Sequence, residues 1–544
     1  MKKRVISGLL AAILSVSLLA GCSGSSSPSS LSAASGPDTA SSGDASSFSG
    51  YPMDAQDKEI TFWVGFNFTL NEAYASAEES PFHIGLEEQT GIPINWQFPT
   101  TGTDSGQAFN LMLASDTLPD IIYYSLMTDA ERYMEENVIR DLSDHIQAYS
   151  PAYYSWLQSN SAYDKAMKTD NGKYYGYGFF REDGGWNDTY LGPVVRQDWL
   201  DALNLESPKT VSDWDTVIRA FKQEYSAPLS FAWSRFNTTG ISGAFGAYGA
   251  TAFKLYVDDN GKIQLAQAQP EWKDYMAQLH QWWADGLIDQ DVTSLDDTAA
   301  RAKALNGGMG ISVTSMGQLT NWEQDAKDSG NGAEWVGVQY PTGDDGTLSM
   351  VFGGYGVGTA VSVITSSCPD EKLETAMRLL DYAYTDEGNL YWNFGTKGVS
   401  WDDDASGEPE FTPLVTEDPD GLNNAISKYS GSVWGGSCIQ ATKLLYLKNS
   451  ETGIKANDTW FYENQEVTAK SVYPPGVTLT TEESNQLDEL VSSLSTYVSE
   501  TAVKYITGEE SLDNFDQFVA TLNEMGLPKV LEIRQAAYDR YLAR

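Results

Sequence analysis

Ile60-Thr61-Phe62-Trp63-Val64 is a short, apolar and partly β-branched stretch of the kind that forms a buried strand. A second stretch of this kind covers residues 92–98, and residues 73–89 between the two have the spacing of a helix. A third strand is predicted at 121–124, directly after the turn-forming residues 115–120. Strands that alternate with helices are typical of sheets with crossover helices. The order of these stretches therefore predicts an α/β fold.

Helices are predicted along much of the remaining chain and dominate its last third. Strands are expected over residues 309–313 and 335–338, and helices over residues 107–114 and 129–146. Another carries an apolar stripe that begins at Trp214, with Ser212 and Asp215 as its expected capping box. The glycine-rich stretch 352–358 is an expected crossing between two sheets, because glycine readily takes up backbone rotation.

The N-terminal region predicts export from the cytoplasm. Basic residues 2–4 precede an apolar run over 5–20, and these 16 residues are fewer than the roughly 20 that an uncleaved membrane helix needs. Residues 1–21 are therefore expected to be a signal peptide. Leu19-Ala20-Gly21-Cys22 resembles the lipobox of bacterial lipoproteins. This resemblance implies that Cys22 becomes the mature N-terminus and carries two acyl chains, which would give stable membrane attachment.

A flexible linker is expected after the lipid anchor. Residues 23–50 contain 13 serines, 4 glycines and 4 alanines in 28 positions, which is too little apolar surface to offset the entropy of an ordered chain. Residues 22–50 are thus the expected lipidated cysteine and linker. Beyond them the sequence has no uninterrupted apolar run of 18 residues. The folded body is expected to touch the membrane only through its lipid.

The charge of the chain argues against some classes of partner. The 34 lysines and arginines face 75 aspartates and glutamates, which gives a formal net charge of −41. Nucleic acid is therefore not an expected partner, because binding to phosphates rests on a basic surface. Anionic sugars such as uronates would be repelled at long range, although one local arginine could override that repulsion.

Histidine and cysteine are too few and too scattered to predict a metal centre. The three histidines, His83, His145 and His280, show no ligand spacing, so neither a zinc site nor a histidine-based triad is expected. No metal or other cofactor is predicted. Apart from Cys22, only Cys368 and Cys438 remain. They could form a disulfide outside the cell, or both could be small buried residues, and the sequence leaves both alternatives open.

Four blocks of sequence carry a family resemblance. The most specific is Val195-Arg196-Gln197-Asp198-Trp199-Leu200-Asp201-Ala202-Leu203-Asn204-Leu205. The other three are residues 114–122 with 138–142, residues 385–388 with 394–399, and residues 508–541. Together the blocks span nearly the whole mature chain. They resemble the extracellular solute-binding proteins of ABC importers, in the branch of sugar-binding lipoproteins of Gram-positive bacteria.

The resemblance implies a two-lobe, periplasmic-binding-protein-like α/β fold with a hinge, an interlobe cleft and a helical C-terminal part. The first lobe is expected to comprise residues 51–177 with 358–393, and the second lobe residues 178–357 with 394–544. The implied function is that of a receptor, not an enzyme. A monomer anchored by lipid to the extracellular face of the cell membrane would capture a carbohydrate, expected to be an oligosaccharide, and deliver it to ABC permease subunits.

One stretch departs from the family pattern. Many relatives carry a calcium loop soon after the helix that ends at residues 220–222, whereas here residues 223–228 lack the Asp/Asn/Gly-rich pattern. Asp258-Asp259-Asn260-Gly261 is acidic, but it lacks the spaced ligands and closing glutamate of an EF-hand. We predict a hairpin turn for this segment.

Candidate ligand-binding residues are chosen by residue type and position. A sugar presents hydroxyl groups and apolar C–H faces, so its site needs flat aromatic rings with polar side chains at their edges. Positions in loops at strand ends rank highest, because open α/β sheets bind ligands there. Tyr124 is also similar in placement to an aromatic residue that stacks on sugar in maltodextrin-binding relatives. The candidates are Trp63, Asn67, Tyr124, Trp186, Asn187, Trp233, Arg235, Tyr355, Trp401 and Trp434. Three other tryptophans, Trp199, Trp214 and Trp282, lie on helical stripes and are assigned to the core.

Other functions compete with sugar capture. A surface carbohydrate-active enzyme could use two carboxylates, but 75 acidic residues make any proposed pair uninformative. No G-x-S-x-G, P-loop or H-E-x-x-H motif supports another enzyme class. A lipoprotein that binds another protein, or a receptor for a non-sugar solute such as a peptide, also remains open.

Overall fold

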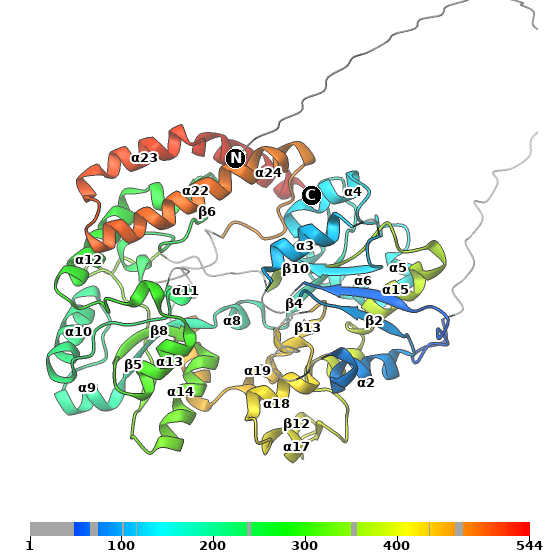
Figure 1. Ribbon diagram of the computed structural model, residues 1–544, viewed down its shortest axis with the longest axis horizontal. Helices are drawn as coiled ribbons and strands as arrows, with labels where there is room; N and C mark the ends of the chain where they lie inside the picture. The colour runs from blue at the N-terminus through cyan, green and yellow to red at the C-terminus, as the bar shows by residue number, and fades with distance from the viewer. Residues whose placement is uncertain are drawn as a thin grey trace, which may run out of the picture. The chain divides into compact units, whose positions relative to one another are not determined.

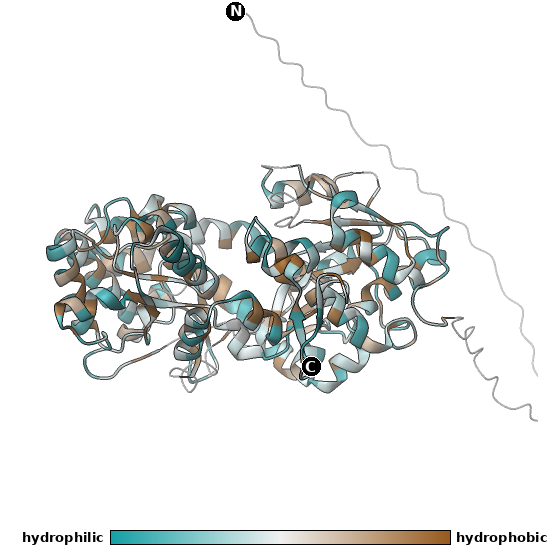
Figure 2. Cartoon of the chain, turned by 90° about the horizontal axis from the view of Figure 1, so that it is seen from below, coloured by the Kyte–Doolittle hydropathy of each residue, from teal (hydrophilic) through white to brown (hydrophobic). Residues whose placement is uncertain are grey.

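The computed structural model describes residues 48–65, 74, 76–100, 103–115, 117–236, 241–349, 356–434, 436–462 and 472–544. Within the unit Phe48–Arg544, a six-stranded and a three-stranded sheet belong to separate hydrophobic cores. Figure 2 shows hydrophobic residues, in brown, along the strands and on parts of the helices beside them. The observed fold is therefore mixed α/β, as the sequence predicts.

The larger sheet has six strands in the order β13-β4-β10-β3-β1-β2 (Figure 1). In chain order they are β1 (Ile60–Val64), β2 (Ile94–Gln97), β3 (Ile121–Tyr124), β4 (Tyr177–Arg181), β10 (Val357–Ile364) and β13 (Ile439–Gln440). β1 runs parallel to β2 and β3, with Phe62 opposite both Trp96 and Ile121. β10 is antiparallel to both of its neighbours, and β13 is parallel to β4. The first three predicted strands are confirmed, although β2 is shorter than predicted.

Helices pack on this sheet and share its core. Three of them are α2 (Pro81–Thr90), α3 (Ser105–Leu113) and α15 (Asp370–Tyr382). The helix predicted over 73–89 is interrupted in its described part. Ser80 has extended backbone, and Pro81 opens α2 because proline suits the first turn of a helix but not its interior.

The continuous helix predicted over 129–146 is wrong. α4 (Ala130–Glu135) ends before Asn137, whose φ of 56° lies in the left-handed region that a helix does not accept. Arg140 then donates its backbone N–H to a carbonyl at the end of β10 at 2.8 Å. Helical structure resumes in α5 (Ile146–Tyr149). The contact with β10, which is distant in sequence, decides the conformation of this stretch.

The second sheet has three antiparallel strands in the order β8-β5-β9. They are β5 (Leu191–Arg196), β8 (Ile311–Ser315) and β9 (Trp335–Gly337). Helices around them include α9 (Gln197–Leu203), α10 (Val211–Tyr225), α12 (Pro270–Ala284), α13 (Asp297–Leu305), α14 (Met316–Ser329) and α20 (Glu451–Tyr462). Gly337 lets α20 pack closely, because an added Cβ there would lie 2.3 Å from the Cβ of Ala456. The strands predicted near 309–313 and 335–338 are confirmed with small shifts.

The start of α10 differs from the predicted capping box. Thr210 is the N-cap and forms the box with Asp213, two residues earlier than predicted. Asp215 instead accepts hydrogen bonds from Arg219 and from the indole of Trp282. The stripe itself is confirmed, since Trp214 and Trp282 are fully buried in the second core. Trp199 is also buried there.

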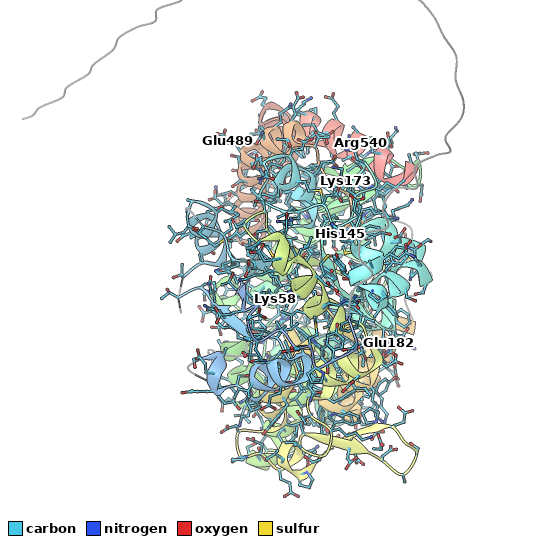
Figure 3. All side chains as sticks on the ribbon, turned by 90° about the vertical axis from the view of Figure 1, so that its right-hand side faces the viewer. Lys58, His145, Lys173, Glu182, Glu489 and Arg540 are labelled. Carbon is cyan, nitrogen blue, oxygen red and sulfur yellow. The ribbon has the colours of Figure 1, made fainter. Side chains whose placement is uncertain are left out.

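The C-terminal part is helical, as predicted. α22 (Thr481–Thr507), α23 (Phe515–Glu524) and α24 (Leu527–Ala543) share the second core with α12, and Figure 1 shows them in orange and red. The end of α24 also contacts the segment that leads into β4 of the six-stranded sheet. Arg540 and Arg544 both pair with Asp170, at 2.5 and 2.6 Å. Figure 3 shows Arg540 near Lys173, which follows Asp170 closely in the chain.

Residues 394–448 join the first sheet through β13, which pairs with β4. They also form a small core around Phe394, Trp401 and Phe411. The boundary expected at 394 placed this segment in the second lobe, whereas β13 belongs to the six-stranded sheet. A two-residue strand has no sequence signature of its own, and only its pairing reveals its place.

Four smaller features bear on questions that the sequence raises. The hairpin turn at 258–261 is confirmed, because it joins the antiparallel strands β6 (Leu255–Val257) and β7 (Ile263–Leu265). Cys368 and Cys438 are both buried and do not form a disulfide. Within the described ranges, no helix has the length and apolarity that crossing a bilayer requires. Over the same ranges, no group of three or more metal-ligating side chains is found.

Candidate ligand-binding site

The carboxyl ends of β1 and β3 bring together an aromatic cluster. Because these strands are parallel neighbours, Trp63 at the end of β1 and Tyr124 at the end of β3 meet at one edge of the sheet. Their ring centroids are 5.9 Å apart in an edge-on arrangement. Phe109 of α3 stacks on Tyr124 at 4.4 Å and lies 6.1 Å from Trp63. We call Trp63, Phe109 and Tyr124 the edge cluster.

A glycine allows the edge cluster to close. Gly65 follows β1, and its N–H donates to the carbonyl of Tyr123 at 3.0 Å. A Cβ at this position would lie 2.5 Å from a ring carbon of Tyr124 and 2.7 Å from one of Trp63. Any side chain larger than hydrogen would therefore displace one of the two rings.

The members of the edge cluster differ in exposure. Trp63 is only 5% exposed and Phe109 is also buried, so these rings belong mainly to the core. Tyr124 is partly buried. A tyrosine in this setting offers a flat apolar face together with a hydroxyl group, the two features that a sugar ring requires of its partner.

The residue before Tyr124 anchors a distant loop. The hydroxyl of Tyr123 accepts a hydrogen bond from the backbone N–H of Gly436 at 2.7 Å. Burial raises the pKa of Tyr123 well above its usual range, so the hydroxyl stays neutral. Gly436 follows η6 (Ser432–Trp434), so this contact ties the backbone near Trp434 to the sheet. The side chain of Trp434 lies outside the described residues.

Trp186, another candidate, packs inside the protein. Its side chain is only 2% exposed. Its indole N–H donates to Asp458 at 2.8 Å, and its ring stacks on Tyr446 at 5.2 Å. The candidates were chosen for loop positions, but residues Gly184–Asp188 form the short helix α8. The backbone of Asn187 lies in this helix, and its side chain is not described.

Trp233 and Arg235 lie on α11 (Trp233–Phe236). Trp233 is partly buried against the second core. Arg235 makes two hydrogen bonds to Asp297, at 3.1 and 2.6 Å. Although burial lowers the pKa of Arg235, these bonds raise it overall. The positive charge of Arg235 is therefore already neutralised by a carboxylate.

Trp401 lies in a different place from the edge cluster. It is 4% exposed and belongs to the small core with Phe394 and Phe411. Its indole N–H donates to the carbonyl of Gly395 at 2.9 Å. Asn67 and Tyr355 lie outside the described residues.

The structure thus brings Trp63 and Tyr124 together and separates them from Trp186 and Trp401. Sequence reasoning missed Phe109 and Gly65. Phe109 lies inside a predicted helix, where nothing in the local pattern distinguishes it from an ordinary core residue. Gly65 directly follows a predicted strand, and this position is a signal that could have drawn attention to it.

Comparisons with known proteins agree with this architecture. The family described as "Bacterial extracellular solute-binding protein" matches residues 72–390. The chain is 23% identical over 523 residues to the fructooligosaccharide ABC transporter substrate-binding protein FusA of Streptococcus pneumoniae, covering 89% of this chain and 92% of that protein. It is 22% identical over 468 residues to the polygalacturonan/rhamnogalacturonan-binding protein YtcQ of Bacillus subtilis, covering 83% and 86% of the two chains.

Solved structures show the same fold. The alginate-binding protein AlgQ2, in a crystal structure without calcium ion, matches with a TM-score of 0.74 and 21% identity over 88% of this chain and 98% of that chain. FusA in complex with kestose matches with a TM-score of 0.69 and 21% identity over 89% and 100% of the two chains. The predicted two-lobe α/β fold is therefore confirmed. Because the family match also covers more than half of the sequence, the chain belongs to the bacterial extracellular solute-binding proteins.

Proposed function

We propose that this protein is a lipid-anchored receptor that captures a neutral oligosaccharide outside the cell and delivers it to the permease subunits of an ABC transporter. The observation that carries the proposal is the edge cluster. A stacked pair of rings, Phe109 and Tyr124, ends at the carboxyl edge of parallel strands, where α/β folds hold their ligands. The similarity to FusA, which is named for fructooligosaccharides, supports a sugar as the ligand.

A neutral sugar fits the charges better than an anionic one. The net charge of −41 disfavours the approach of uronates. Arg235 was the candidate arginine that could have overcome this repulsion, but Asp297 already pairs with it at 2.6 Å. The relative YtcQ is named for polygalacturonan, so uronates are the informative alternative to test.

The proposed lobes follow the points where the chain crosses between sheets. It leaves the six-stranded sheet after β4, returns to it at β10, and leaves again after β13. In this proposal residues 51–181 and 357–448 form most of the first lobe. A ligand between the lobes would favour closure only if it contacts both of them.

The proposed anchor rests on the sequence of residues 1–22. The signal peptide would be removed, and the lipidated Cys22 and the linker up to residue 50 would hold the receptor at the membrane. Replacing Cys22 (Cys22→Ala) is expected to move the protein from the membrane fraction to the medium. Retention of this variant in washed membranes would contradict the anchor.

A binding titration tests the proposed ligand class. Kestose, maltotriose, trigalacturonate and a tripeptide would each be titrated against the purified protein by calorimetry and tryptophan fluorescence. Saturable binding of one neutral trisaccharide per chain is expected, without release of monosaccharides. Binding confined to trigalacturonate or to the peptide would overturn the ligand class, and hydrolysis of the sugar would point to an enzyme. The expected monomer can be checked by light scattering of the same sample.

A further inference from the structure

A second cavity lies on the first lobe, apart from the edge cluster. It has a volume of about 400 Å³ and opens between α16 (Asp386–Phe394) and the hairpin of β11 (Trp401–Asp403) and β12 (Pro409–Phe411). We call it the hairpin pocket. Six of its lining residues carry the argument: Gln89, Tyr382, Glu387, Tyr391, Lys397 and Trp401. None of the edge-cluster residues lines this cavity.

The hairpin pocket and the edge cluster lie at opposite ends of the parallel strands. Gln89 is in the last turn of α2, just before the chain enters β2. A crossover helix runs opposite to the strands it joins, so its last turn lies at the amino ends of those strands. Tyr124, in contrast, is at the carboxyl end of β3. The two sites are therefore not parts of one cleft.

Aromatic side chains form the inner wall of the hairpin pocket. Tyr391 donates its hydroxyl hydrogen to the carbonyl of Phe82 at 2.6 Å. The indole N–H of Trp401 donates to the carbonyl of Gly395 at 2.9 Å. Both rings are held by these bonds, and their polar atoms are satisfied within the protein.

Tyr382 is different, because its hydroxyl is buried without a hydrogen-bond partner in the described structure. The side chain is 0% exposed. A buried hydroxyl without a partner is costly and rare enough in native proteins to need an explanation. Burial, and to a smaller extent the charge of Glu387, raises the pKa of Tyr382 well above its usual range. The hydroxyl therefore remains protonated and keeps its donor hydrogen.

The polar groups of the pocket select the chemistry of an occupant. The hydroxyl of Tyr382 needs an acceptor, whereas the exposed carboxylate of Glu387 needs a donor. A hydroxyl group on a ligand meets both needs, while a ligand carboxylate would be repelled by Glu387. Lys397 offers little to an anion, because its ammonium group pairs with Asp403 at 2.6 Å.

From this geometry we propose that the hairpin pocket is a second binding site for a single neutral sugar unit, distinct from the transport site. The exposed carboxylate of Glu387 and the hydroxyl of Tyr382 bind neighbouring hydroxyl groups of the sugar, while the buried rings of Tyr391 and Trp401 support the site from within. At about 400 Å³ the cavity lies near the lower end of the usual range for small-molecule sites, which suits one or two sugar rings. The proposal concerns an accessory site and does not require that the edge cluster bind sugar.

The test follows Trp401 by ¹⁹F NMR in the full chain labelled with 5-fluorotryptophan. The signal is assigned with Trp401→Phe, and glucose, galactose, fructose and N-acetylglucosamine are each titrated to 50 mM. At least one of these sugars is expected to shift the Trp401 signal saturably. The shift is expected to persist in Tyr124→Ala, which removes the exposed ring of the edge cluster. Because this variant alters only the edge cluster, it shows whether sugar binding at the hairpin pocket holds even if the proposed function fails.

Two variants test the role of the polar pair. Tyr382→Phe removes only the hydroxyl that lacks a partner, and it is expected to weaken sugar binding about five- to tenfold without lowering the melting temperature. Glu387→Gln changes an exposed side chain and is expected to weaken binding similarly. The matched control is Tyr384→Phe, because Tyr384 lies near the same helix end but donates its hydroxyl to the carbonyl of Gly178.

Three results would overturn the proposal. One is the absence of any saturable shift of the Trp401 signal with all four sugars, which would mean that the cavity holds only water. Another is equal affinity of the unaltered protein and Tyr382→Phe. The third is a loss of the shift in Tyr124→Ala, which would place the sugar at the edge cluster instead.

Discussion

The edge cluster and the hairpin pocket both combine aromatic rings with hydroxyl groups, yet they differ in how those groups are used. At the edge cluster, Trp63 and Phe109 are buried and support Tyr124, which is only partly buried. In the hairpin pocket every aromatic ring is nearly buried, and one hydroxyl has no partner among the residues that the structure describes. Aromatic content therefore does not identify a site. Exposure and unsatisfied polar atoms do.

The largest expected effect concerns Trp63. Its buried ring supports Tyr124 and is not expected to contact the ligand. Trp63→Ala should lower the free energy of unfolding by about 3–5 kcal/mol, as expected for a buried aromatic side chain. Urea denaturation monitored by circular dichroism measures this change. A loss below about 1 kcal/mol would mean that Trp63 faces solvent or ligand, and the division between support and contact would fail.

A slightly smaller effect concerns Asp381, which precedes Tyr382. The Asp381 carboxylate is buried and accepts the backbone N–H of Tyr153 at 2.8 Å, and burial raises its pKa to about 6. The native state therefore holds this proton more tightly than the unfolded chain, in which the pKa is about 4. The resulting stability is present below pH 4 and is lost as the pH rises through 6, by about 2–3 kcal/mol.

The variant Asp381→Asn isolates this contribution from the general effect of the chain's negative charge. Unfolding free energies of both proteins would be measured at several pH values from 4 to 7. The difference between the two curves is expected to change over this range and to become constant above it. Parallel curves would show that Asp381 does not titrate in this way.

The next effect concerns ligand affinity at the edge cluster. Tyr124→Ala is expected to weaken oligosaccharide binding about tenfold by removing the partly exposed ring. Gly65→Ala should weaken it as well, because the added Cβ would lie 2.5 Å from the Tyr124 ring. Calorimetry with the trisaccharide that binds best measures both changes. Tyr382→Phe serves as the control and should leave this affinity unchanged, since the two sites are separate.

The smallest effect concerns the indole of Trp401. Trp401→Phe keeps a ring in the wall of the hairpin pocket but removes the donor to the carbonyl of Gly395. A loss of about 1 kcal/mol in unfolding free energy is expected for one hydrogen bond. The oligosaccharide affinity of the edge cluster should not change. A large loss of that affinity would show that Trp401 belongs to the transport site after all.

Much of the fold could be predicted because its signals are local. The stretch at 60–64 and the stripe through Trp214 contain their periodicity within a few residues, and both predictions are confirmed. The helix predicted over 129–146 failed, because Asn137 and the pairing with β10 override the local pattern. β13 could not be predicted for a related reason: a strand of two residues carries no period, and only its pairing with β4 reveals it.

The candidate site was harder to predict than the fold. Trp63 and Tyr124 were found because both stand at the ends of predicted strands. Trp186 met the same criteria, but its partner Asp458 lies 272 residues away in the sequence. A loop position and a residue type indicate which ligand a side chain could bind. They do not indicate whether that side chain already contacts another part of the protein.

The amino-acid sequence by itself determined the charge of the chain, the strand and helix periods, and the resemblance to a family that the comparisons confirm. These properties depend on single residues or on neighbours along the chain. Only the tertiary structure decided which aromatic rings pack against other segments of the protein. It also decided that, within the described ranges, the hydroxyl of Tyr382 has no hydrogen-bond partner. Such outcomes depend on contacts between segments hundreds of residues apart, and local sequence patterns do not encode them.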